Sequence, residues 1–300
     1  MAAATPVTRM PGAPTARPAS RRSRAWIGIV PFFAFAGAFL ILPVGFLLVG
    51  SFFDEAGAFS VAAYGNLFRP DILSSFLATI EVSLVTAIAG GILGLLLAYA
   101  VILGGLPRPL RSAVMTFSGV ASNFAGVPLA LAFIFTLGQL GLVTKLLKDV
   151  LGYNPYQHGF TLYSKLGLEI VYLYFQIPLM VLVIAPAIDG LRREWQEAAL
   201  NLGATPRQYW RHVALPVLAP TILGSMVLLF GNAFGAYATA YQLTGGTLNI
   251  VGVKVGAQIS GDVLHDQALG YALAVGMVIV MSVAIALYVW LQRRAERWRR

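Results

Sequence analysis

Apolar residues fill long blocks of this chain, and charged residues are confined to short segments between the blocks. Six stretches contain no Asp, Glu, Lys or Arg, and each is close to or above the roughly 20 residues that a membrane-spanning helix needs. None of them shows the alternation of a transmembrane strand. Because backbone polar groups in lipid must be satisfied within the segment, these stretches predict helices. The six predicted spans lie near 26–50, 77–103, 113–138, 166–187, 218–243 and 268–291.

Composition supports an all-α, polytopic membrane domain over residues 25–292. Hydrophobic residues make up 58% of the 300 and charged residues 11%, with a mean hydropathy of +0.77. A soluble domain carries roughly 25% charged residues, so a soluble fold is excluded. With no cysteine, the chain has no disulfide, thiolate metal site or cysteine nucleophile. The net charge of +9 could suggest nucleic-acid binding, but the bases lie beside the predicted spans.

The distribution of Lys and Arg predicts the orientation. Six spans place both termini on one side, and 16 of the 21 bases fall on that side. Basic loops stay in the cytoplasm, so both termini are expected there. Residues 1–24, rich in Arg and free of acids, predict a disordered cytoplasmic tail, and 293–300 predict a second basic tail. A cleaved signal peptide is the competing interpretation, but the apolar run after Arg24 exceeds the usual 7–15 residues, which favours an uncleaved first span.

The cytoplasmic loop 188–217 is the one connection with a pattern of its own. It reads as two short helices, the first with an apolar stripe at helical spacing. Gly203 stands where a C-terminal cap would end that helix. Thr205 is a natural N-cap for the second, with Pro206 at the first helical position and Gln208 completing a capping box. The stripe consists of Leu191, Trp195, Ala198, Ala199 and Leu202.

Two interpretations fit this helical hairpin. It can lie on the inner leaflet with its arginines at lipid phosphates. Alternatively, its small residues offer a close-approach surface that fits a groove on a cytoplasmic partner.

The residues of the hairpin resemble a known motif. Glu197-Ala198-Ala199, three residues, Gly203, nine residues, Val213, one residue and Leu215-Pro216 match the EAA loop of ATP-binding-cassette importer permeases. Only Val213 differs, because the family has Ile there. The resemblance implies a type I importer permease fold in the prokaryotic plasma (inner) membrane. It also implies three partners: cytoplasmic ABC ATPase subunits that contact the EAA loop, a second permease subunit, and an extracytoplasmic solute-binding protein.

The chain itself lacks the means to bind ATP through a phosphate loop. No Gly-x-x-x-x-Gly-Lys-Ser/Thr sequence occurs in it. We therefore expect a transport subunit rather than an enzyme, with ATP hydrolysis on a partner. His158 and His265 are isolated in loops, so neither a metal nor another cofactor is expected.

Polar residues within the spans are candidates for the solute path. Glu81 and Glu169 stand in the first turns of the second and fourth spans, where two carboxylates could guide a cationic solute. The alternative is that each acid stabilises a helix N-terminus. The uncharged candidates can line the path or bridge packed helices. They are Asn123, Gln176 and Asn232.

The stretch after the fifth span most resembles the polyamine (spermidine and putrescine), phosphonate and iron branch of the importers. A polyamine would also suit Glu81 and Glu169. Sugar, sulfate and amino-acid importers remain alternatives within the family. The rival from another class is a secondary transporter or channel driven by an ion gradient, which would place ionisable residues near the bilayer midplane. The residues carrying the branch resemblance are Leu243, Thr244, Gly245, Gly246, Asn249, Gln258 and the run Leu269, Gly270, Tyr271, Ala272.

Overall fold

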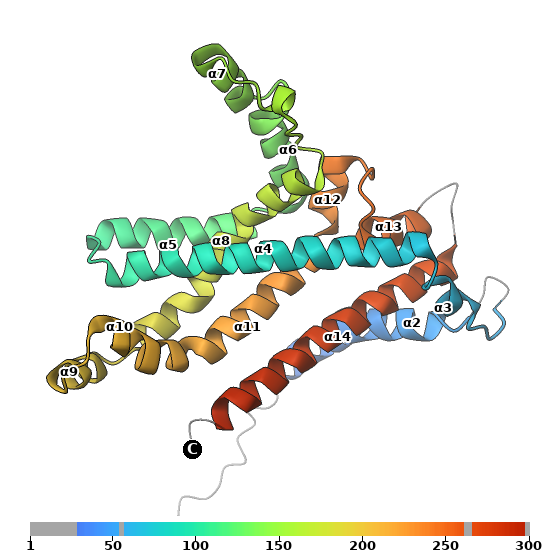
Figure 1. Ribbon diagram of the computed structural model, residues 1–300. Helices are drawn as coiled ribbons and strands as arrows, with labels where there is room; N and C mark the ends of the chain where they lie inside the picture. Colours follow the sequence, from blue (N-terminus) through green and yellow to red (C-terminus); the bar gives the residue numbers. More distant parts are fainter. Residues whose placement is uncertain (1–28, 54–56, 261–265, 298–300) are drawn as a thin grey trace, which may run out of the picture. The chain divides into compact units, whose positions relative to one another are not determined.

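The computed structural model confirms an all-helical chain with six candidate membrane spans (Figure 1). It describes residues 29–53, 57–260 and 266–297, so the predicted tail 1–24 and the end of the predicted C-terminal tail lie outside the described residues. The chain divides into two compact units, 1–46 and 47–300. By length and composition, the candidate spans among these residues are Val30–Gly50, Pro70–Leu103, Gly126–Leu151, Lys165–Asp189, Pro206–Phe234 and Gln267–Arg293.

The first span is helical throughout. Helix α1 (Val30–Ala36), a π-helical turn (Gly37–Ile41) and helix α2 (Leu42–Gly50) follow one another without a break. None of these elements contains a buried side chain. A helix that is apolar on every side is suited to lipid rather than to water.

The second unit is a bundle in which α4 (Pro70–Leu103) packs along α8 (Lys165–Asp189) and α11 (Leu215–Phe234). Helix α5 (Arg108–Asn123) lies on α8, and α14 (Gln267–Arg297) lies against α11 (Figure 1). With 34 residues, α4 is about 50 Å long at 1.5 Å per residue, which exceeds the bilayer core.

Small residues let α4 approach its neighbours closely. A Cβ built on Gly90 would lie 2.6 Å from Gln176 Cβ, and one built on Gly94 would lie 2.5 Å from Met180 Cβ. Such residues are typical of helix contacts in membranes, where close packing replaces the hydrophobic effect. The buried small residues of α4 are Ser75, Thr79, Ser83, Thr86, Ala87, Gly90, Gly91, Gly94 and Ala98.

The third predicted span, near 113–138, is broken in the structure. Helix α5 ends at Asn123, and a new helix, α6, runs from Gly126 to Leu137. Ala125 is extended and Gly126 has a φ of +74°, a left-handed conformation that glycine adopts without steric cost. The charge-free pattern predicted one continuous helix because a Gly in an apolar run does not by itself end the run.

The fifth predicted span, near 218–243, is also broken. Helix α11 ends at Phe234, and α12 (Tyr237–Thr244) follows after Gly235 and Ala236. The Tyr172 hydroxyl donates to the Ala236 carbonyl at 2.9 Å, which satisfies a backbone group at the break. Non-helical backbone at membrane depth needs such partners.

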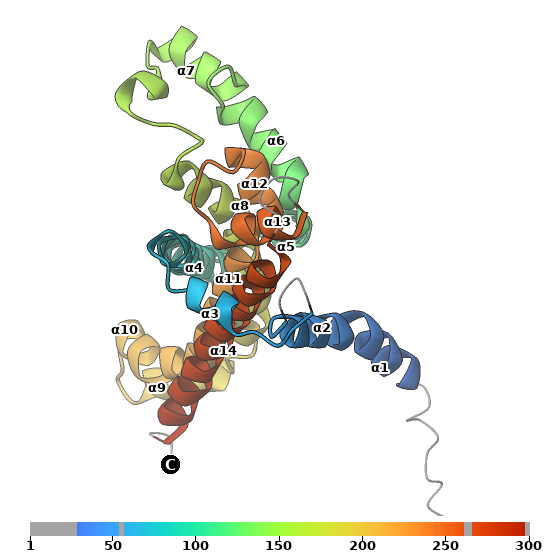
Figure 2. The same cartoon turned by 90° about the vertical axis from the view of Figure 1, so that its right-hand side faces the viewer.

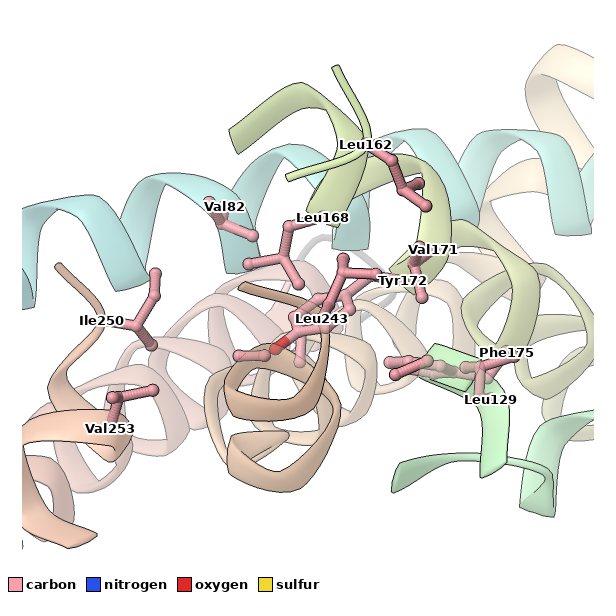
Figure 3. Close-up of a cluster of buried hydrophobic side chains, with 13 residues drawn as sticks. Val82, Leu129, Leu162, Leu168, Val171, Tyr172, Phe175, Leu243, Ile250 and Val253 are labelled. Atoms are coloured by element: carbon pink, nitrogen blue, oxygen red, sulfur yellow. The ribbon is translucent and has the colours of Figure 1, made fainter. Parts of the chain in front are cut away.

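The two breaks are joined to each other. The Gly126 N–H at the start of α6 donates to Thr239 Oγ1 of α12 at 2.8 Å. Around this joint, apolar side chains from α4, α6, α8 and α12 form a buried cluster that includes Leu129, Phe175 and Leu243 (Figure 3). The joint therefore lies beside a buried cluster, although Phe124, Ala125 and Gly235 at the breaks are themselves exposed.

Short helices complete the chain. Figure 2 shows α9 and α10 at one end of the second unit and α7 at another. They are α3 (Ala62–Asn66), α7 (Leu142–Leu151), a 3₁₀ turn (Pro155–His158), α9 (Arg193–Asn201), α10 (Pro206–Tyr209), a π-helical turn (Trp210–Ala214) and α13 (Val251–Ser260).

Candidate coupling hairpin and solute cavity

The segment between α8 and α11 folds into the helical hairpin that the sequence predicts. Helix α9 carries Glu197, Ala198 and Ala199, and ends before Gly203, whose φ is +82°. The Ala204 N–H donates to the Ala199 carbonyl at 3.0 Å and closes the helix end.

The capping box that begins α10 is formed in full. The Gln208 N–H donates to Thr205 Oγ1 at 3.3 Å, and the Thr205 N–H donates to Gln208 Oε1 at 2.7 Å. Pro206 occupies the first helical position. Local capping therefore holds the angle between α9 and α10.

The surface of α9 is open. The helix contains no buried residue, and Leu202 at its end is 88% exposed. The Glu197 carboxylate accepts a hydrogen bond from Arg193 Nε at 3.0 Å, yet its side chain remains 59% exposed. An exposed apolar stripe beside charges is the kind of surface that a partner or a lipid leaflet covers.

Between the two helices lies a hollow of about 330 Å³. Its walls bring together residues of the first helix, of the turn and of the π-helical turn that follows α10. This places Ala199, Gly203 and Val213 of the EAA pattern around one depression, although they are spread over 15 residues of sequence. The lining residues are Ala199, Leu202, Gly203, Ala204, Gln208, Tyr209, His212 and Val213.

The hairpin is attached to the bundle through the π-helical turn Trp210–Ala214. Tyr209 and Ala214 are buried, and the Trp210 ring packs edge-on against the Tyr99 ring of α4, with 5.0 Å between ring centroids. Leu215 and Pro216, the end of the EAA pattern, begin α11 directly after this turn. The hairpin is therefore in contact with α4 and continuous with α11.

A second feature is a cavity of about 730 Å³ in the bundle. Residues from α5, α8, α11 and α14 line it, and they include two of the predicted path residues, Asn123 and Asn232. Ser122 and Tyr288 add hydroxyl groups that the sequence pattern did not single out. The lining residues are Ser122, Asn123, Leu179, Leu182, Gly224, Val227, Leu228, Gly231, Asn232, Met281, Ile285 and Tyr288.

Gln176, another predicted path residue, lies outside the cavity lining. Its side chain is fully buried, and its Nε2 donates to the Leu229 carbonyl at 2.9 Å. Its Oε1 has no hydrogen-bond partner among the described residues. With Gly90 packed against its Cβ, Gln176 joins α4, α8 and α11.

The two acidic candidates lie at the start of α8 and on the facing part of α4. Glu81 forms an ion pair with Lys165, whose side chain is 38% exposed. Glu169 follows Lys165 by one helical turn on α8. Neither carboxylate is among the described residues that line the cavity.

The described residues form candidate membrane-spanning helices, an exposed helical hairpin and a cavity with neutral polar groups, which together are typical of a polytopic transport component. The sequence profile of the family described as "binding-protein-dependent transport system inner membrane component" matches residues 90–299. This match covers more than half of the chain, and the protein belongs to this family. Membership confirms a multi-pass transport subunit of the inner membrane that is not itself the ATPase.

Named relatives of this chain carry different solutes. It is 28% identical over 211 residues to the sulfate transport system permease protein CysT of Salmonella typhimurium, covering 69% of this chain and 70% of that one. It is 26% identical over 232 residues to the trehalose transport system permease protein SugB of Mycobacterium tuberculosis, covering 77% of each. The predicted polyamine solute finds no support in these relatives.

Solved structures share the fold. A chain of a bacterial ABC transporter involved in the import of the acidic polysaccharide alginate matches with a TM-score of 0.70 and 18% identity, covering 90% of this chain and 95% of that one. A chain of the inward-facing MetNI methionine ABC transporter matches with a TM-score of 0.52 and 16% identity, covering 76% and 99%.

Proposed function

We propose that this protein is the permease subunit of an importer for a sulfate-type oxyanion. In this proposal the cavity between α5, α8, α11 and α14 is part of the solute path, and the α9–α10 hairpin receives a separate ATPase subunit. Family membership and the similarity to CysT support the class of transporter and of solute. The observation that carries the solute proposal is the chemistry of the cavity lining.

The cavity offers hydrogen-bond donors without a carboxylate among its described lining residues. The Asn232 amide and the Tyr288 hydroxyl can donate to the oxygens of an anion. The Asn123 amide and the Ser122 hydroxyl donate to the Gly119 carbonyl at 2.9 and 3.3 Å, so they reach an anion only by turning away from that carbonyl. The remaining lining is apolar. Neutral donors bind an oxyanion without the opposite charge that would hold it too tightly to leave, a condition for passage.

The hairpin and the charge distribution support the rest of the proposal. The exposed α9 surface and the hollow beside Gly203 suit a close contact with a cytoplasmic partner, which we take to be an ABC ATPase subunit. The bias of Lys and Arg supports a cytoplasmic location of the hairpin and of both termini. A second permease subunit and an extracytoplasmic solute-binding protein complete the proposed importer.

A substitution that adds a negative charge without changing the shape of the side chain tests whether the solute is an anion. Asn232→Asp adds one negative charge to the cavity with almost no change in shape. Two unit charges 4 Å apart interact by about 4 kcal/mol at an effective dielectric of 20, so uptake of sulfate should fall at least about tenfold. The measurement is uptake of radiolabelled sulfate by proteoliposomes that contain the complete importer.

Asn232→Ser is the matched control, since it shortens the side chain without adding charge, and it should retain more uptake than Asn232→Asp. Equal sulfate uptake by the Asp variant and the parent would refute the oxyanion path. If trehalose is taken up instead and the Asp substitution changes its uptake little, the sugar alternative replaces the proposal.

The two acids, Glu81 on α4 and Glu169 near the start of α8, should contribute little to transport. Glu81→Gln combined with Glu169→Gln is expected to leave sulfate uptake within about twofold of the parent, because a partly exposed ion pair such as Glu81–Lys165 contributes only about 0–1 kcal/mol. The same proteoliposome measurement applies. A loss of uptake comparable with that of Asn232→Asp would show that these carboxylates belong to the path after all.

A further inference from the structure

Helix α7 has two chemically different faces. Leu142, Leu146 and Val150 follow one another at helical spacing and are 64%, 52% and 73% exposed. Lys148 lies on the opposite side of the helix and Lys145 lies at the edge between the two faces, as the spacing of about 100° per residue requires. Large apolar side chains in a row on an exposed helix face are a surface that something covers.

The helix is held at the end of α6. Only four residues, 138–141, separate the end of α6 at Leu137 from the start of α7. The Leu137 carbonyl accepts hydrogen bonds from Thr144 Oγ1 at 3.2 Å and from the Tyr156 hydroxyl at 2.8 Å. Thr144 is the buried residue of α7, so the exposed apolar face points away from this attachment.

We infer that α7 lies in the surface of the bilayer, with its apolar face at the acyl-chain boundary and its lysines at anionic headgroups. Amphipathic helices with lysines on the polar face bind membranes in this way. The surface follows closely on the apolar helix α6, from which only four residues, 138–141, separate it.

Charge and aromatic residues favour this location over a continued crossing. Lys145, Lys148 and Asp149 fall within ten residues, and charges are costly inside the hydrocarbon core. Tyr153 and Tyr163, in the segment that follows α7, are 46% and 42% exposed. Exposed tyrosines are typical of the headgroup region, where one end of the ring is apolar and the hydroxyl is wet.

Such an anchor would fix the height of α6 in the membrane. The far end of α6 is bonded to α12 through Gly126 and Thr239. A fixed α7 would thus hold α6 in place, and α6 carries Gly126, one of the two partners in the joint between the broken spans.

The chain contains no cysteine, so single cysteines can be labelled without background. Leu142→Cys, Leu146→Cys and Val150→Cys, each carrying a nitroxide, are compared with Lys145→Cys and Lys148→Cys in the full chain. The proteins are reconstituted in vesicles of phosphatidylglycerol and phosphatidylcholine. Collision with oxygen, which partitions into lipid, is measured against collision with a water-soluble nickel complex. We expect oxygen to dominate by severalfold at the three apolar positions and the nickel complex to dominate at the two lysine positions.

Two results would overturn the inference. Equal access of the nickel complex to all five positions would place α7 in water, and shielding of the apolar positions from both reagents would show a protein contact instead. For the headgroup preference, Lys145→Gln with Lys148→Gln should increase the mobility of a label at Leu146→Cys in phosphatidylglycerol but not in pure phosphatidylcholine. The same response in both lipids would refute it. These readouts do not depend on uptake, so they hold whatever solute is carried.

Discussion

Gly203→Val is expected to lower uptake at least about tenfold and to release the ATPase subunit, while the membrane bundle stays folded. Gly203 has a φ of +82°, a conformation that costs ordinary residues about 1–2 kcal/mol and is least accessible to β-branched ones. The turn would re-form elsewhere and change the angle between α9 and α10. Uptake by proteoliposomes and co-purification of the ATPase subunit measure the two effects.

Gly203→Asn distinguishes the effect of the backbone conformation at this position from the effect of a side chain on the surface that the partner contacts. Asn tolerates the left-handed conformation, and a Cβ at this position meets nothing within 4 Å. If the turn alone matters, the Asn variant should keep most of the uptake. If both variants lose the ATPase subunit equally, the partner must contact Gly203 directly.

Glu197→Lys tests whether the exposed surface of α9 contacts the ATPase subunit. The Glu197 carboxylate is exposed and makes one ion pair with Arg193, worth about 0.3–0.5 kcal/mol, so folding should not suffer. The reversed charge should weaken ATPase binding. Undiminished binding by this variant and by Gly203→Val would show that the hairpin is not the coupling surface.

Gly94→Ala is expected to destabilise the bundle by about 1–3 kcal/mol, as overpacking of a filled core does. The added methyl group would lie 2.5 Å from Met180 Cβ and 2.7 Å from the Ile177 carbonyl oxygen. The backbone of α8 cannot yield as a flexible side chain would. The midpoint of thermal unfolding in detergent should therefore fall.

Gly119→Ala in α5 is the matched control. A Cβ there meets nothing within 4 Å, so the same substitution should be neutral or slightly stabilising, since Ala favours helix over Gly by about 0.5–1 kcal/mol. Equal unfolding midpoints for the two variants would mean that α4 and α8 are not packed as closely as the structure places them.

The local structure of the hairpin could be predicted because its causes are local. Gly203, Thr205 and Gln208 act on backbone groups within a few residues, and the helix end and the capping box form as expected. The EAA pattern is equally local, and family membership agrees with it. Substrate choice has no such local cause. The residues after the fifth span pointed to a polyamine, whereas the named relatives carry sulfate or trehalose.

The broken spans were missed for a different reason. Hydropathy reports whether a segment prefers lipid, and it is nearly unchanged when a helix breaks within that segment. At the break after Phe234, the Ala236 carbonyl accepts a hydrogen bond from Tyr172, which is 64 residues away in the sequence. At the break before Gly126, the Gly126 N–H donates to Thr239, which is 113 residues away.

The blocks of apolar residues, with charges only between them, were sufficient to determine a six-span helical membrane protein, because burial of backbone polar groups in lipid allows little else. The hairpin and its caps also followed from neighbouring residues. Only the tertiary structure decided which polar residues share a space. It placed Asn123 and Asn232 on one cavity, Gln176 in a packed interface and Glu81 beside Lys165. A polar side chain in a span looks the same in sequence whether it faces solute, helix or counter-ion, since that difference is made by residues distant along the chain.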